Sequence, residues 1–306
     1  MRRTPHATNN QVHFPRCAVL GVALLIGACG STAASGAAQT DGGGALTDGS
    51  QASTDAGAGS DSTAPVVSDL CKNPPADLAT SKQRSQSCSL GDDARFFVRS
   101  APYSKVVIEV GSTKIATPSK AATDHLVAVM GSLLDKSGGV TVLVDSPIDD
   151  VGHPITLAQA GALEDGARTQ FSQGDTVVFY YLVVSDGSTD DTSAGTVLGY
   201  AYRPSSMVVF QKSIFANSGG LGQPSRDIVE STVVAHEFGH ILGLVNARTP
   251  MQTPHEDSAH PKHDVNTACL MYYANNSSAG LANLLSGGAV PDFDTACRAD
   301  VAALLR

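Results

Sequence analysis

The chain has 306 residues, no tryptophan, and 20 basic against 29 acidic side chains, which gives a formal net charge of −9 at pH 7. This acidic balance argues against nucleic acid and anionic lipid surfaces as partners. The length left after an N-terminal export signal suits one domain with its own core, and we expect a monomer.

The N-terminal 28 residues have the pattern of an export signal. Arginines at 2, 3 and 16 precede the apolar run CAVLGVALLIGA, which is too short for a membrane span, since a spanning helix needs about twenty apolar residues. The run ends in IGAC, which resembles the lipobox of bacterial lipoproteins. The resemblance implies cleavage before Cys29, acylation of its sulfur and a lipid anchor in the membrane of a bacterial cell envelope. An ordinary signal peptide cleaved nearby is the alternative.

Residues 29–66 are nearly all Ser, Thr, Ala, Gly, Asp and Gln. A segment of this composition cannot bury enough apolar surface to offset the entropy lost on ordering, so we predict a disordered tether. Behind a lipidated cysteine, the tether would let the folded domain, residues 67–306, stand off from the membrane while staying attached.

Four cysteines remain beyond the signal and the lipid site, and four cysteines allow three pairings. In an exported protein disulfides are the default state. Proximity in sequence favours Cys71 with Cys88 and Cys269 with Cys297.

Strands and helices alternate in the middle of the chain. The segment TVVFYYLVV is apolar throughout, which indicates a buried central strand. We predict strands at 104–110, 139–144, 176–184, 195–202 and 206–211, and helices at 121–134, 156–171 and 294–305.

The stretch IVESTVVAHEFGHILGLV at 228–245 contains an HExxH motif. Residues four apart lie on one face of a helix, so His236 and His240 can bind one metal ion while Glu237 points at a water beside it. This arrangement predicts zinc-activated hydrolysis.

The motif lies in a segment with the signals of a buried helix. Ser225 offers an N-cap, Asp227 lies in the first turn where the helix dipole favours an acid, and Gly243 can end the helix. The remaining faces are apolar, so we expect the helix to be buried.

Gly243 also extends the motif to HExxHxxG, and Met271, followed by Tyr272 and Tyr273, is a candidate Met-turn. In these features the sequence resembles the metzincin zinc peptidases. The resemblance implies an α+β zincin fold with a mixed twisted sheet, an antiparallel edge strand, an active-site helix and a small C-terminal subdomain. It also implies that the strand at 195–202 pairs with an extended peptide substrate, the alternative being a capped edge without a ligand.

The third metal ligand of the metzincin pattern is a histidine or aspartate, and this chain has Asn246 in that place, which is a poor zinc ligand. Three histidines follow, and each could complete the site if the chain loops back after the helix. They are His255, His260 and His263.

The run from His263 to Met271, HDVNTACLM, resembles the archaemetzincin pattern HCxxxxCxM. This resemblance implies that His263 is the third ligand and that Met271 forms the floor beneath the metal. Asp264 stands where the pattern has a cysteine. The alternative for His255 and His260 is that they are polar loop residues.

Three histidines on zinc would leave a fourth position for water, with Glu237 as the general base. The resemblance implies that Tyr273 assists the oxyanion, and a core tyrosine is its alternative. A catalytically inactive zinc-stabilised surface or binding lipoprotein competes with the peptidase hypothesis, supported by Asn246 and opposed by the intact Glu237. A gluzincin-type site with Glu256 as third ligand is a further option, weakened by its Pro-rich, loop-like surroundings.

Overall fold

The computed structural model describes residues 69–306 except 194 and 277–287. The predicted export signal, Cys29 and the tether predicted at 29–66 lie outside these residues. In the part of the chain that is described, no helix has the length and apolar character needed to cross a membrane.

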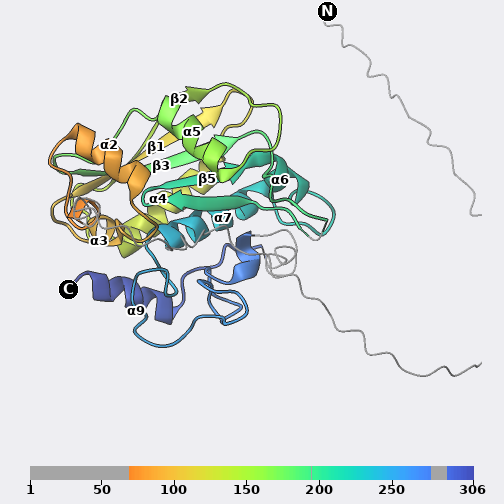
Figure 1. Ribbon diagram of the computed structural model, residues 1–306. Helices are drawn as coiled ribbons and strands as arrows, with labels where there is room; N and C mark the ends of the chain where they lie inside the picture. Colours follow the sequence, from red (N-terminus) through yellow and green to blue (C-terminus); the bar gives the residue numbers. More distant parts are fainter. Residues whose placement is uncertain (1–68, 194, 277–287) are drawn as a thin grey trace, which may run out of the picture. The chain divides into compact units, whose positions relative to one another are not determined.

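The centre of the domain is a five-stranded mixed sheet with strand order β2-β1-β3-β5-β4 (Figure 1). Strand β4 pairs antiparallel with β5 at one edge, and the other neighbouring strands are parallel. The predicted α+β fold class with an antiparallel edge strand is therefore confirmed. The strands are β1 (Lys105–Thr113), β2 (Val140–Ile148), β3 (Thr176–Val184), β4 (Gly199–Arg203) and β5 (Ser206–Phe210).

Two apolar cores lie on opposite faces of the sheet, because successive side chains of a strand point to opposite sides. Phe179 and Tyr181 of β3 belong to the core shared with α4 (Lys120–Leu133) and α7 (Arg226–Ile241). Tyr180 and Leu182 belong to the core on the side of α5 (Leu157–Ala167). Burial on both faces explains why the predicted central strand is apolar throughout.

Several short helices complete the described chain, and three of them carry no clear periodic signal in the sequence. These three are α2 (Leu78–Ser87), α3 (Ala94–Val98) and α6 (Gln211–Ala216). The 3-10 helix η1 (Tyr273–Asn276) and α9 (Thr295–Leu304) follow α7 in the C-terminal part.

Helix α7 begins and ends where its sequence predicts. The Ser225 side chain accepts a hydrogen bond from the N–H of Ile228 at 3.3 Å, which caps the first turn. At the other end Gly243 has a φ of +66°, a left-handed conformation that favours glycine. A Cβ at Gly243 would lie 2.8 Å from the carbonyl oxygen of Ala247, so a larger residue would not fit the turn.

A buried carboxylate anchors α7 to the rest of the fold. Glu230 is fully buried, and its Oε1 accepts hydrogen bonds from the Tyr181 hydroxyl and the Ser119 N–H, each at 2.9 Å. Arg226 lies 3.3 Å from the other carboxylate oxygen. These partners join α7 to β3 and to the start of α4, which fixes the position of the helix before its HExxH motif begins.

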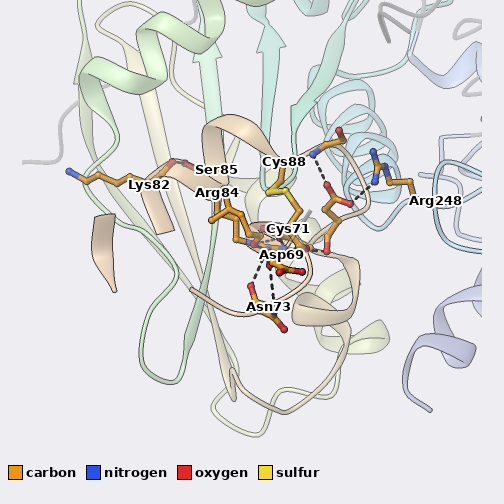
Figure 2. The surroundings of a disulfide bond; sticks show 12 residues. Asp69, Cys71, Asn73, Lys82, Arg84, Ser85, Cys88 and Arg248 are labelled. Carbon is orange, nitrogen blue, oxygen red and sulfur yellow. Dashed lines mark hydrogen bonds and ion pairs between the residues drawn. A yellow bond between two sulfur atoms is a disulfide. The ribbon is translucent and has the colours of Figure 1, made fainter. Parts of the chain in front are cut away.

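The predicted disulfide between Cys71 and Cys88 is present (Figure 2). The buried Arg84 lies inside the closed loop, where it donates to the carbonyl oxygen of Cys71 at 2.8 Å and to Asp93 at 2.8 Å. The chain after the loop packs against the turn that ends α7, since a Cβ at Gly91 would be 3.1 Å from the Cα of Gly243. The segment that follows the disulfide loop therefore packs against the C-terminal end of α7.

The second predicted disulfide, between Cys269 and Cys297, is absent, because both residues are buried free thiols with their Sγ atoms 3.7 Å apart. Each sulfur has hydrogen-bonding partners instead of a covalent bond. The Met271 N–H donates to Cys269 Sγ at 3.4 Å, and Cys297 Sγ donates to Asp264 Oδ2 at 3.6 Å. The hydrogen bond with Cys269, together with burial, raises the pKa of Cys297, which keeps it protonated.

Candidate metal centre

Three buried histidines meet at one point between α7 and the loop that follows it. His236 and His240 come from α7 and His263 from the loop, and one ring nitrogen of each lies within 4.8 Å of those of the other two. The Nε2 atoms of His236 and His240 are 3.2 Å apart. Zn–N bonds of about 2.0–2.1 Å at tetrahedral angles place two ligand nitrogens about 3.3–3.4 Å apart, so this spacing suits one shared ion.

Backbone carbonyls set the tautomers of two of these rings. His236 Nδ1 donates to the carbonyl oxygen of Leu270 at 2.7 Å, and His263 Nδ1 donates to that of Pro261 at 3.1 Å. A carbonyl oxygen only accepts, so each Nδ1 carries the proton and each Nε2 presents a lone pair on the opposite side of the ring. Metal-binding histidines are commonly oriented in this way.

His240 is held in the neutral form that a metal requires. Burial lowers the pKa of His240 well below its ordinary value, and the nearby His263 and Lys262 lower it further. A neutral imidazole keeps a lone pair for a metal ion, whereas an imidazolium has none. The donor set, three imidazole rings without a fourth protein ligand among the described residues, fits zinc with an open coordination position.

Glu237 lies beside the histidines and is fixed by the edge strand. It is 1% exposed, and its Oε2 accepts a hydrogen bond from the N–H of Ala201 in β4 at 2.7 Å. The strand can approach the helix because residue 199 is glycine. A Cβ there would lie 2.7 Å from Val233 Cγ1 and 3.4 Å from Glu237 Cγ.

Met271 lies beneath the helix, where the candidate Met-turn was predicted. Its side chain is fully buried and packs against Gly239, which stands between Phe238 and His240 of the motif. A Cβ at Gly239 would overlap Met271 Sδ and would come within 2.9 Å of Phe293 Cε1. The glycine therefore allows close contact between the helix and the residues under the histidines.

Two alternative third ligands lie outside the histidine group and bind each other. The exposed Asn246 donates from Nδ2 to Glu256 Oε2 at 3.0 Å, and Glu256 Oε1 accepts from the N–H of Lys262 at 2.8 Å. Val245 and Asn246 both have positive φ, so the chain turns away immediately after the helix. This turn explains why the residue at the usual spacing does not reach the metal centre.

The other two loop histidines also have partners of their own. His255 lies between Asp264 and Asp300, with ring nitrogens 2.7 Å and 2.9 Å from their carboxylates. Burial alone would lower the pKa of His255, but its hydrogen bonds and charge interactions with these carboxylates outweigh burial and raise it. His260 Nδ1 lies 2.8 Å from Asp257 Oδ2. Of the three loop histidines, the fold thus brings His263 to His236 and His240 on α7.

Tyr273 lies in η1, and its ring stacks on that of His260 with centroids 3.5 Å apart and an interplanar angle of 4°. The ring of Tyr272 contacts the ring of Tyr273, with centroids 4.7 Å apart. The predicted role of Tyr273 at the oxyanion stays a prediction.

Sequence reasoning missed a supporting residue, Asn275. Its fully buried side chain donates from Nδ2 to the carbonyl oxygens of Leu270 at 2.8 Å and Cys269 at 3.0 Å. The Leu270 carbonyl is the group that orients His236, so Asn275 supports the ligand from behind. One of two asparagines in the run YYANN gives no signal of this role in the sequence.

Comparison with known proteins finds similarity in structure but none in sequence. No protein-family model and no curated protein matches the sequence. Among solved structures, the crystal structure of archaemetzincin from Methanopyrus kandleri is similar, with a TM-score of 0.43 and 14% sequence identity, over 66% of this chain and 96% of that chain.

Proposed function

We propose that the protein is a zinc-dependent endopeptidase that acts as a monomer on extended peptide segments. The observation that carries this proposal is the meeting of three buried histidine nitrogens beside a buried glutamate that bonds to the edge of a sheet. A site that only stabilises the fold needs no such glutamate, which favours an enzyme over the inactive binding protein.

The residues have separate tasks in this proposal. His236, His240 and His263 hold the zinc ion, which when bound supplies a Lewis acid that activates water and polarises the peptide carbonyl. Glu237 takes a proton from the attacking water and returns it to the leaving amine nitrogen. The Ala201 N–H holds the Glu237 carboxylate in position until the water and the peptide enter.

The free edge of β4 supplies a binding surface for the substrate. This strand is the last in the sheet order, so one of its sides has no neighbouring strand among the described residues. An extended peptide can pair with such an edge through backbone hydrogen bonds. The peptide would then lie along the strand that contacts Glu237.

We further propose that the enzyme is a lipoprotein, tethered through acylated Cys29 to a bacterial membrane outside the cytoplasm. The short apolar run before IGAC and the polar, small-residue segment at 29–66 support this location.

The test of the function is hydrolysis by the purified full-length protein loaded with one equivalent of zinc. We expect cleavage of casein, gelatin or members of a diverse peptide library, and loss of cleavage after zinc removal by a chelator. Absence of cleavage at full zinc occupancy would reject the peptidase and favour the binding protein.

A further inference from the structure

A buried histidine outside the metal group connects the loop of His263 to the last helix. His255 is 6% exposed, and its Nδ1 lies 2.7 Å from Asp264 Oδ2 while its Nε2 lies 2.9 Å from Asp300 Oδ2. Both carboxylates are fully buried. One imidazole ring thus joins two carboxylates that are 36 residues apart in the sequence.

Asp264 directly follows His263, and its own contacts fix that part of the backbone. The Asp264 N–H donates to the carbonyl oxygen of Met271 at 2.8 Å. The carbonyl oxygen of His263, which belongs to the same peptide group, accepts from the N–H of Asp257 at 2.7 Å. On the other side of His263, its own N–H donates to the carbonyl oxygen of His260 at 3.2 Å. The backbone on both sides of His263 is therefore held by hydrogen bonds, and the Asp264 side chain connects it to His255.

Asp300 forms the fixed end of this connection. It lies in α9, and its Oδ1 accepts from the N–H of Gln252 at 2.6 Å. The end of α9 is held in turn by Arg99, whose Nε donates to the carbonyl oxygen of Leu304 at 2.6 Å. Helix α9 is thus bonded both to the loop before His255 and to the N-terminal part of the domain.

We infer that His255 is a positioning residue that holds His263 at the metal centre through Asp264, with Asp300 as the fixed end. This inference rests on the proposed function, because it takes His263 as a zinc ligand. The segment around His263 is a loop with little regular structure, so its ordering entropy opposes metal binding unless the fold orders it beforehand. The chain of hydrogen bonds from Asp264 through His255 to Asp300, called the bridge below, supplies this order.

A second metal ion is the competing interpretation of the same cluster, because ligand atoms of His255, Asp264, Asp294 and Cys297 also lie within 4.8 Å of one another. The hydrogen bonds favour the bridge. Both ring nitrogens of His255 are engaged by carboxylates, and Asp294 accepts from the Cys297 N–H at 2.9 Å and from Asn266 Nδ2 at 3.1 Å. A metal ion would have to replace these bonds.

The test compares zinc affinity in full-length variants that each keep half of the bridge. In His255→Asn the amide nitrogen can replace Nδ1 and bind Asp264, whereas in His255→Gln it can replace Nε2 and bind Asp300. We expect each to raise the zinc Kd about tenfold, at the lower end of the effect of residues that support a metal ligand. His260→Asn is the matched control, since His260 bonds to Asp257 instead, and we expect its zinc Kd to equal that of the wild type.

Cobalt(II) in place of zinc separates positioning from ligation. We expect the same visible bands in wild type and in both His255 variants, because His236, His240 and His263 remain the ligands, with faster loss of cobalt from the variants. Should a His255 variant misfold by circular dichroism, Asp300→Asn replaces it, since this change removes only the acceptor of Nε2.

Three results would overturn the inference: a zinc Kd within twofold of the wild type in the folded variants, a changed cobalt spectrum, or a second zinc equivalent that disappears with His255. A wild-type protein that binds no zinc at all would instead reject the proposed function. The two failures are therefore distinguishable.

Discussion

Ala201 and Glu237 are joined by a 2.7 Å hydrogen bond between the edge strand and helix α7. The bond links the surface proposed to bind the peptide to the group proposed to move the proton. It also gives a reason for Gly199, because the strand could not lie this close to the helix with a side chain at that position.

Replacement of Glu237 should separate metal binding from hydrolysis. We expect Glu237→Gln and Glu237→Ala to retain one zinc and the fold, and to lose about a hundred- to ten-thousand-fold in rate, as for removal of a positioned general base. Glu237→Gln is the sharper variant because its amide oxygen can still accept from Ala201. Zinc content and peptide cleavage are measured on the same sample, and wild-type cleavage rates in Glu237→Gln would contradict the role.

The third ligand is tested by metal retention. We expect His263→Ala to lose its zinc on dialysis against a mild chelator, because only two ligands from α7 remain. Asn246→Ala and His260→Ala should keep it, since these side chains bond to Glu256 and Asp257. His255→Ala should weaken binding far less than His263→Ala. An empty site in His260→Ala with zinc retained in His263→Ala would disprove the assignment.

Two helical glycines should respond oppositely to alanine. Gly239→Ala introduces a methyl group against Met271 and Phe293, and overpacking of this kind costs about 1–3 kcal/mol. Gly131 of α4 has open space around it, and alanine there should stabilise by about 0.5–1 kcal/mol through helix propensity. Urea denaturation of the metal-free proteins measures both changes. Equal effects of the two substitutions would argue against tight packing under the histidines.

The N-terminal disulfide should contribute strongly to stability. Its half-cystines are 17 residues apart, and closing a loop of about this size is worth about 3 kcal/mol in the chain-entropy model. We expect the double variant Cys71→Ser, Cys88→Ser to lower the free energy of unfolding by about 3 kcal/mol. Non-reducing peptide mapping should show the Cys71–Cys88 peptide in wild type, and its absence would refute the pairing.

Lipidation is tested by processing and fractionation. We expect a precursor that accumulates with globomycin, and a mature protein in the membrane fraction. Cys29→Ser should abolish both the globomycin-sensitive cleavage and the anchoring. A variant that is still processed and anchored normally would refute acylation at Cys29.

Features with local or periodic signals were predictable from the sequence. The central strand and α7 follow from apolar patterns, an N-cap and a glycine, and the order of strands and helices gave the class of fold. The pairing of Cys71 with Cys88 was also predictable, because the two lie close in sequence. The same reasoning was wrong for Cys269 and Cys297, because proximity does not distinguish a disulfide from two thiols in contact.

Features built from distant residues were not predictable. The bridge from Asp264 through His255 to Asp300 joins residues whose spacing fits no local motif. Asn275 acts through the Leu270 carbonyl, which no side-chain pattern reveals. The choice of His263 from three histidines came from a resemblance, and the positive φ at Asn246 that takes the chain away from the helix is visible only in the structure.

The position of Asp300, which follows all three histidines of the metal site in the sequence, has a consequence for biosynthesis. A chain terminated shortly before this residue would contain His236, His240 and His263, yet would lack the carboxylate that bonds to His255. Metal binding would then be weaker in chains that stop before α9 and would reach full strength only once α9 has been made. Zinc occupancy would in this way report that synthesis has passed α9.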